Sequence, residues 1–368
     1  MRLLTFLGLV PVVMASTGDQ LPRFTHCLQN CVTEMGCGGP MSESTMVNLY
    51  SSELSNPEYS LNPLASLFWN CQDDCSYRCQ QIISDAREAS NKAMVQFYGK
   101  WPFKRIFGIQ EFYSVLFSLG NFYVNYRSLF TVLYQYNKNK KDPNPIYRQI
   151  NYQYLLLILG SLFGWTFSSI FHFRDNRFTE TLDYFGAFAI ILLNFNAISY
   201  RFLELFNLPL VWQGAWKIGL VLMYLFHVTK MKLNWDYNYN TTVNMLFGIC
   251  AMVMWMVHSF NIFRLYRKNY VVYNNSIQLL PFETRLLHKL NYLFISKASI
   301  IPLIPIFLNI WLMGGIMFEV VEFTPKYRLI DGHSIWHFFT IFPSIIWYDW
   351  NIWDIELLKI TNDLQKHV

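Results

Sequence analysis

Three histidines in this 368-residue chain, His172, His333 and His337, have the spacing of metal ligands. His333 and His337 are four residues apart, so in a helix their imidazoles project from the same face. All three fall at the ends of apolar segments of membrane length, where an ionisable side chain is costly and usually marks a functional site. Three imidazoles with a fourth position left open form the ligand set of a catalytic zinc ion. The pattern therefore predicts a Zn²⁺ site.

Two more polar residues accompany the histidines. Ser168 stands four residues before His172 and so repeats the same helical spacing, and Asp183 follows after a short charged loop. Zinc polarises a carbonyl group and lowers the pKa of its bound water. Asp183 could take a proton from that water and return it to the leaving group, while Ser168 could donate to the developing oxyanion. We therefore expect metal-assisted hydrolysis of an acyl bond in a lipid, with Asp183 and Ser168 as catalytic residues.

Simpler interpretations exist for the individual residues. A single histidine near a helix end is usually an interfacial side chain, and we assign His227, His258 and His288 to that class. Serines such as Ser168 commonly pack between membrane helices or bond back to a carbonyl group. Asp183 fits a simple interpretation less well, because a carboxylate buried in a membrane protein needs a partner.

The composition indicates which elements must position these residues. The chain is 53% hydrophobic and 18% aromatic, with only 14% charged residues, whereas a soluble domain carries about 25%. It is therefore expected to be an all-α polytopic membrane protein. The net charge of +5 is small and the basic residues cluster in loops, so we expect no nucleic-acid partner.

Seven apolar segments have close to the roughly 20 residues that cross a bilayer. They lie near 109–133, 152–173, 178–200, 208–229, 242–263, 294–318 and 333–351. The basic loops 138–148 and 264–268 should be cytoplasmic, which makes the amino terminus lumenal and the carboxyl terminus cytoplasmic. The fold predicted is a bundle of seven transmembrane helices, with the histidines, Ser168 and Asp183 all at the lumenal side.

The chain divides into four expected regions. Residues 1–15 have a basic tip, a short apolar run and small residues at the end, as a cleaved signal peptide does. A lumenal domain (16–105), the seven-span domain (106–352) and a cytoplasmic tail (353–368) follow. The expected location is the endoplasmic reticulum membrane, with the Golgi membrane as second choice. Asn240 begins a sequon on the lumenal side, so a glycoprotein is expected.

Six of the seven cysteines precede the first apolar segment: Cys27, Cys31, Cys37, Cys71, Cys75 and Cys79. An even count in a translocated region indicates a disulfide framework, for which six cysteines allow 15 pairings. The Cys-x3-Cys-x3-Cys spacing of the last three would also suit a zinc knuckle. The oxidising lumen favours disulfides over that alternative.

Acidic residues near the expected lumenal ends have a simple interpretation. Glu111, Glu319 and Glu322 are expected to be interfacial charges, and Asp349 and Glu356 are expected to lie at the cytoplasmic side. None of them enters the predicted zinc site.

At the histidines the chain resembles a superfamily of seven-span membrane hydrolases that includes the alkaline ceramidases and the adiponectin/progestin-type receptors. The shared pattern is Ser-x3-His, an aspartate eleven residues after that histidine, and a late His-x3-His. The resemblance implies that His172, His333 and His337 bind zinc, with Ser168 and Asp183 beside them.

Further motifs are similar to those of one branch, the GPI-remodelling lipases known as post-GPI attachment to proteins factor three, or Per1-like. They are Gly99-Lys-Trp-Pro-Phe-Lys-Arg105, Gln110-Glu111, Phe171-His-Phe-Arg-Asp175 and Thr179-Glu-x-x-Asp183-Tyr-Phe185. Members also carry a cysteine-rich lumenal region. Two departures are visible: Tyr98 stands where a histidine is expected, and Phe112 where a proline is expected. Both concern local loop structure and leave the predicted zinc ligands untouched.

This resemblance implies a zinc-dependent phospholipase A2-type hydrolase. Its substrates would be GPI-anchored proteins in the membrane lipid, from whose phosphatidylinositol it would remove the sn-2 acyl chain to give a lyso-GPI. Two alternatives remain open at this point. One is a ceramidase-like amide hydrolase, against which the cysteine-rich region and the Gly-Lys-Trp-Pro-Phe segment count. The other is a non-catalytic receptor or chaperone on the same scaffold.

Overall fold

The computed structural model describes residues 16–37, 68–268, 283–292 and 298–366. The expected signal peptide, 1–15, lies outside these residues. The regular backbone within the described ranges is helical, and the only pairing of β type there is at three isolated bridges. The contacts between residues group the chain into two units. The first comprises 1–116, 172–175 and 317–335, and the second comprises 117–171, 176–316 and 336–368.

In the first unit, two helices carry five of the six cysteines, and Cys37 follows the first of them by three residues. Helix α1 spans Pro22–Glu34 and helix α3 spans Cys71–Ala89. The structure selects one of the 15 pairings, joining Cys27 to Cys79, Cys31 to Cys75 and Cys37 to Cys71. Cysteines four residues apart share a face of their helix, so antiparallel helices pair them in descending order. The disulfide prediction is therefore confirmed, and the zinc-knuckle alternative for Cys71, Cys75 and Cys79 is wrong.

The loop before the last helix is bound to α3. The Arg328 guanidinium is almost fully buried and donates to Gln81 Oε1 at 3.1 Å and to Glu88 Oε2 at 2.7 Å. It also pairs with Asp85. In addition, Lys104 N donates to Arg328 O at 2.9 Å. Because this loop leads directly into the last helix, the cysteine-rich region fixes the place where His333 begins its helix.

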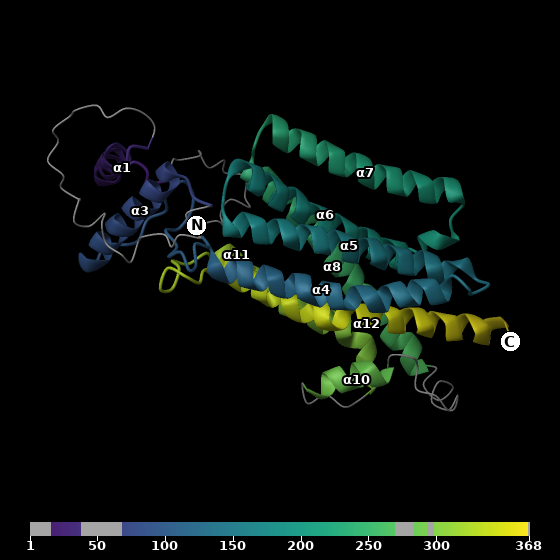
Figure 1. Cartoon of the computed structure of the whole chain (residues 1–368). Coiled ribbons are helices and arrows are strands. Elements are labelled where there is room, and N and C mark those ends of the chain that lie inside the picture. Colours follow the sequence, from purple (N-terminus) through teal and green to yellow (C-terminus); the bar gives the residue numbers. More distant parts are fainter. Residues whose placement is uncertain (1–15, 38–67, 269–282, 293–297, 367–368) are drawn as a thin grey trace. The chain divides into compact units, whose positions relative to one another are not determined.

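The described part of the second unit consists mainly of long helices (Figure 1). They are α4 (Phe112–Asn139), α5 (Pro145–Phe173), α6 (Arg177–Phe202), α7 (Leu210–Leu233), α8 (Tyr237–Lys268), α11 (Ile304–Val321) and α12 (Gly332–Lys366), with the short α10 (Glu283–Asn291), η4 (Leu205–Asn207) and η5 (Ala298–Leu303) between them. Residues 353–366, which we expected to be a tail, continue α12.

Helices α5 and α6 approach each other closely. A Cβ atom on Gly186 would lie 3.1 Å from the Gly164 Cα atom, so neither position leaves room for a larger side chain. Small residues of this kind let helix backbones meet in membrane proteins. Helix α6 starts with a capping box in which Asn176 Oδ1 accepts from Thr179 N and Thr179 Oγ1 accepts from Asn176 N. Together these contacts fix the start of α6, which carries Asp183 in its second turn, and the packing of α6 against α5.

Four helical segments within the described residues are long and apolar enough to cross a membrane: 145–173, 177–202, 237–268 and 298–321. They match the second, third, fifth and sixth predicted spans. The other three predictions coincide with α4, α7 and α12, which have 28, 24 and 35 residues. Helix α12 contains several buried polar residues, among them Asp349, Asn351 and Asp354. These polar residues lower the mean hydropathy of α12, so the helix does not count as an apolar span although it is long enough to cross a bilayer.

Asn240, the expected glycosylation site, lies in the first turn of α8 and is only 8% exposed. Its Oδ1 atom accepts from Asn244 Nδ2 at 3.0 Å. The acceptor side chain of the sequon is therefore buried, and we expect Asn240 to carry no glycan.

The disulfide pairing gives a first prediction. Replacing Cys31 and Cys75 by serine should lower the free energy of unfolding of the α1–α3 region by about 2–5 kcal/mol, because the unfolded chain then gains the freedom of a long loop. Limited proteolysis in rising urea, read at peptides from 16–105, measures the loss. Cys250→Ser is the control, since Cys250 is exposed and outside the disulfides. Equal urea midpoints for all three proteins would contradict the pairing.

Candidate metal centre

The three histidines come from two helices. His172 is the penultimate residue of α5, while His333 and His337 occupy the first two turns of α12. A reciprocal pair of hydrogen bonds fixes the start of α12: Ser334 N donates to Asp331 Oδ1 at 2.8 Å, and Asp331 N donates to Ser334 Oγ at 3.0 Å. This arrangement satisfies amide groups that a helix leaves without a partner at its first turn.

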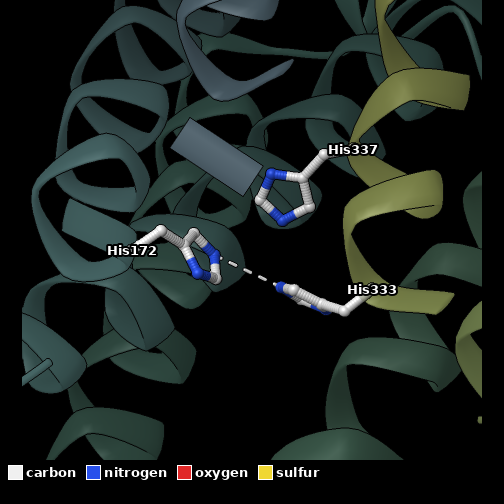
Figure 2. A group of neighbouring side chains, drawn as sticks. All are labelled: His172, His333 and His337. Atoms are coloured by element: carbon white, nitrogen blue, oxygen red, sulfur yellow. Dashed lines mark hydrogen bonds between the residues drawn. The ribbon is translucent and has the colours of Figure 1, made fainter. Parts of the chain in front are cut away.

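The three imidazoles converge (Figure 2). One ring nitrogen of each lies within 4.8 Å of the other two, as a shared metal ion requires. His172 Nε2 and His333 Nε2 are 3.3 Å apart. A tetrahedral zinc ion with Zn–N bonds of about 2.0–2.1 Å holds its ligand nitrogens about 3.3 Å from one another. The spacing of this pair therefore fits a common ion.

The outer nitrogen of His172 is bound to Glu111. His172 Nδ1 lies 2.7 Å from Glu111 Oε2, and both side chains are buried. The carboxylate accepts a hydrogen bond from Nδ1–H, which leaves the electron pair of Nε2 pointing at the centre of the site. Glu111 N also donates to His172 O at 3.0 Å, so main chain and side chain together fix this histidine.

Lys100 supports Glu111 from the other side. Its Nζ atom lies 2.8 Å from Glu111 Oε1 and 2.8 Å from Asp175 Oδ2. Burial lowers the pKa of Lys100, but the two carboxylates more than offset this effect and hold the pKa above its usual value. The ammonium group therefore stays charged and keeps Glu111 ionised, so that its carboxylate can accept the hydrogen bond from His172. Three separate sequence motifs therefore meet at this place, through Lys100, through Glu111, and through His172 and Asp175.

His333 has the same kind of partner. Its Nδ1 atom lies 2.9 Å from Glu319 Oε2, near the end of α11. The His333 and Glu319 side chains are 36% and 32% exposed, in contrast to the buried His172–Glu111 pair. The group of histidines is thus closed behind His172 and partly open beside His333.

A hydroxyl group binds the outer nitrogen of the third histidine. Ser118 Oγ on α4 lies 2.8 Å from His337 Nδ1 and 3.2 Å from Ser168 Oγ on α5. Asn121, one turn further along α4, donates to His337 O at 2.8 Å and to Thr340 Oγ1 at 2.9 Å. Helix α4 therefore holds the second turn of α12 in place. All three Nδ1 atoms have outer partners, and this leaves three Nε2 atoms for a cation.

The two predicted catalytic residues occupy different surroundings. Ser168 is 4% exposed and belongs to the Ser118 contact just described. Asp183 is half-buried in the second turn of α6. Its neighbour Tyr184 has its ring centroid 6.3 Å from that of Phe171, the residue before His172. Phe171 and Tyr184, the residues that adjoin His172 and Asp183 in the sequence, are therefore neighbours across α5 and α6.

Several interpretations from the sequence need correction. Glu111 and Glu319, taken as interfacial charges, are instead the partners of His172 and His333. His227 and His258, taken as interfacial, are 0% and 4% exposed and lie inside the second unit. The position of Glu111 in the Gln110-Glu111 motif was a signal that could have identified it. Ser118 lies in an otherwise ordinary apolar helix and had no such signal.

The sequence matches known proteins over nearly its whole length. The sequence model of the Per1-like family matches residues 63–355. Protein PER1 of Saccharomyces cerevisiae is 30% identical over 350 residues, covering 93% of each chain. Post-GPI attachment to proteins factor 3 of Drosophila melanogaster is 28% identical over 357 residues, covering 96% of this chain and 93% of its own. The human GPI-specific phospholipase A2-like PGAP3 is 26% identical over 367 residues, covering 99% and 98%.

The outer partners of the histidines give a second prediction. Glu111→Gln and Glu319→Gln should each weaken zinc binding by about 10–100-fold, because the imidazole loses the group that orients it. Zinc retained against a graded series of chelator concentrations measures the change. Glu322→Gln is the matched control, because Glu322 is an exposed carboxylate of the same region that accepts from Gln96 Nε2. Unchanged zinc retention in both test variants would argue against a metal at these histidines.

Proposed function

Because this chain belongs to the Per1-like family, we propose that it remodels GPI anchors by zinc-dependent hydrolysis. The bond cleaved is the sn-2 acyl ester of the phosphatidylinositol that anchors a protein, and the products are a fatty acid and a lyso-GPI. The names of the Drosophila and human relatives support the substrate class and, in the human case, the ester position. The convergence of three imidazoles with bound outer nitrogens is the observation that carries the proposal.

The donor set suits zinc. Imidazole nitrogens with no thiolate among them favour a borderline cation such as Zn²⁺, and outer carboxylates raise the basicity of the ligands. Bound at His172, His333 and His337, the ion would polarise the ester carbonyl group and lower the pKa of the attacking water. The side beside His333, which is partly exposed, is where the lipid ester would approach.

Asp183 moves the proton in this scheme. Its carboxylate accepts a proton from the attacking water as the new bond to the acyl carbon forms. It then passes the proton to the sn-2 oxygen as the ester C–O bond breaks, so that the lyso-lipid leaves as an alcohol. A half-buried position in the second turn of α6 suits this role, because the reacting ester would lie within the leaflet.

Ser168 donates to the oxyanion through an ordered chain of hydrogen bonds. With the ion bound at its Nε2 atom, His337 would donate from Nδ1–H to Ser118 Oγ, 2.8 Å away, and the Ser118 hydroxyl group would then donate to Ser168 Oγ, 3.2 Å away. The Ser168 hydroxyl proton is then directed to a third acceptor, which is the carbonyl oxygen as it gains negative charge. Ser118 acts through Ser168 and is a positioning residue.

We also infer seven membrane spans, with α4, α7 and α12 added to the four most apolar segments. Helix α7 supports this inference best, since most of its large apolar side chains are exposed. Examples are Val211 at 79%, Ile218 at 61% and Phe226 at 62% exposure. An exposed apolar face of this size is typical of contact with lipid or another protein. Seven spans and a lumenal amino terminus place the histidines at the lumenal side of the endoplasmic reticulum membrane.

The third prediction tests the activity. In cells lacking the protein, GPI anchors should keep an unsaturated sn-2 chain, and wild-type protein should restore remodelling while His333→Ala should not. Lipid mass spectrometry of isolated GPI anchors is the measurement. His26→Ala is the matched control, because His26 is exposed on α1 and is outside the candidate centre. Full restoration of anchor remodelling by His333→Ala would contradict a role for a histidine-bound zinc ion in the reaction.

A fourth prediction separates an enzyme from a receptor or chaperone on this scaffold. Asp183→Asn should keep its zinc and lose ester hydrolysis by about 10²–10⁴-fold, because only proton transfer is removed. The readouts are metal content and fatty-acid release from a purified GPI lipid. If the wild-type protein binds the lipid but releases no fatty acid, and Asp183→Asn behaves in the same way, the protein is a binder and the hydrolase proposal is wrong.

A further inference from the structure

The short helix α10 has two different faces. Leu286 and Leu290 are 0% and 4% exposed and pack into the core of the second unit. Thr284, Arg285 and His288 lie on the other face and are exposed. An amphipathic helix with a basic face is typical of segments that lie in the plane of a membrane interface.

A cluster of cations surrounds this helix. The first turn of α10 meets the end of α8, because Tyr266 OH donates to Glu283 Oε1 at 2.8 Å. Arg267 and Lys268, the last residues of α8, are exposed. Basic clusters next to membrane helices attract anionic lipid headgroups.

One buried carboxylate is shared by two of the cations. Asp349 Oδ2 on α12 lies 2.9 Å from Arg285 Nε and 2.6 Å from Lys289 Nζ. Asp349 can neutralise only one of them. With Arg267 and Lys268 close by, the described part of this cluster carries a surplus of positive charge even after Glu283 and Asp349 are counted.

An apolar cavity of about 230 Å³ lies next to these cations. Its lining is almost entirely hydrocarbon and includes Leu290, Ile300, Ile304, Trp311, Phe342 and Ile346. Lys289 Nζ donates to Ile345 O, the residue next to one of these. Phe307, which also lines the cavity, is 52% exposed, so the cavity is open to the surroundings of the bundle.

We propose that this site binds an anionic glycerophospholipid of the bilayer. The phosphate would pair with Arg285, Lys289 and the end of α8, and part of one acyl chain would fill the cavity. A soluble anion would leave the apolar cavity unfilled. A zwitterionic lipid has no net charge, so the surplus of cations would add little to its binding free energy. The combination of both features in one place therefore selects a lipid that has a charged headgroup.

The bound lipid is distinct from the substrate of the histidine centre. Asp349 follows His337 by twelve residues on one helix, and a rise of 1.5 Å per residue separates them by about 18 Å along α12. A headgroup at Asp349 therefore lies far from the candidate reactive atoms. This lipid is a resident one, held near the middle of α12 and independent of the proposed hydrolysis.

Purified full-length protein in phosphatidylcholine nanodiscs, titrated with labelled phosphatidylserine, tests the proposal. Arg267→Gln/Lys268→Gln should weaken phosphatidylserine binding roughly tenfold, since basic side chains at a membrane surface each contribute to anionic lipid binding. Both residues are exposed, so folding should be preserved. Lys140→Gln/Lys141→Gln is the matched control, with the same loss of charge in an exposed loop elsewhere. Arg285→Gln/Lys289→Gln is a stronger test, provided that it folds without the partners of Asp349.

A cavity variant tests the acyl chain separately. Ile300→Trp should fill the cavity and weaken phosphatidylserine binding, because Ile300 is only half-buried and can be enlarged with little strain. Inorganic phosphate should compete poorly with the lipid. Equal binding by the wild-type and all variant proteins would overturn the proposal. So would equal affinity for labelled phosphatidylcholine, or displacement of the lipid by phosphate alone at comparable concentration.

Discussion

The separation of 3.3 Å between His172 Nε2 and His333 Nε2 is the constraint on which the rest of this structure depends. Because Glu111 and Glu319 take the outer nitrogens, both inner nitrogens direct electron pairs toward the same small volume. Two such electron pairs repel each other unless a proton or a cation lies between them. The third ring, His337, is held by Ser118 at its own outer nitrogen and supplies a third ligand for the cation that we propose. An arrangement of this kind has to be enforced by the surrounding fold.

The contacts that hold the histidines in place come from segments that a hydropathy analysis would assign to different regions of the chain. Helix α4 supplies Ser118 and Asn121, which hold the second turn of α12. The segment before α4 supplies Glu111, and Lys100 neutralises it. The disulfide-bonded region reaches the same area through Arg328, whose loop leads into α12. The cysteine-rich region therefore has a structural role in fixing the start of α12, beyond any contact that it makes with a substrate.

Much of this could be predicted from the sequence, for physical reasons that differ between features. Helical spacing identified His333 and His337, since positions i and i+4 share a face whatever the helix packs against. The compartment identified the disulfides, but their pairing required the antiparallel direction of α1 and α3. Four predicted spans agree with apolar helices. Glu111 and Ser118 could not be identified by spacing, because they lie more than fifty residues in sequence from the histidines that they orient. Only the packing of α4 against α5 and α12 brings them there.

The same reasoning explains why charge at the start and at the middle of α12 has different consequences. Near His333 a carboxylate and an imidazole pair at a partly exposed site. Near Asp349 a buried carboxylate faces two cations beside an apolar cavity, and the surplus there is positive. A buried charge is tolerated only when it is paired, so each of these two places must recruit its partners from a neighbouring helix. At the first place the pairing leaves the inner nitrogen of His333 for the cation that we propose, and at the second it leaves the positive charge to which we assign the phosphate of a lipid.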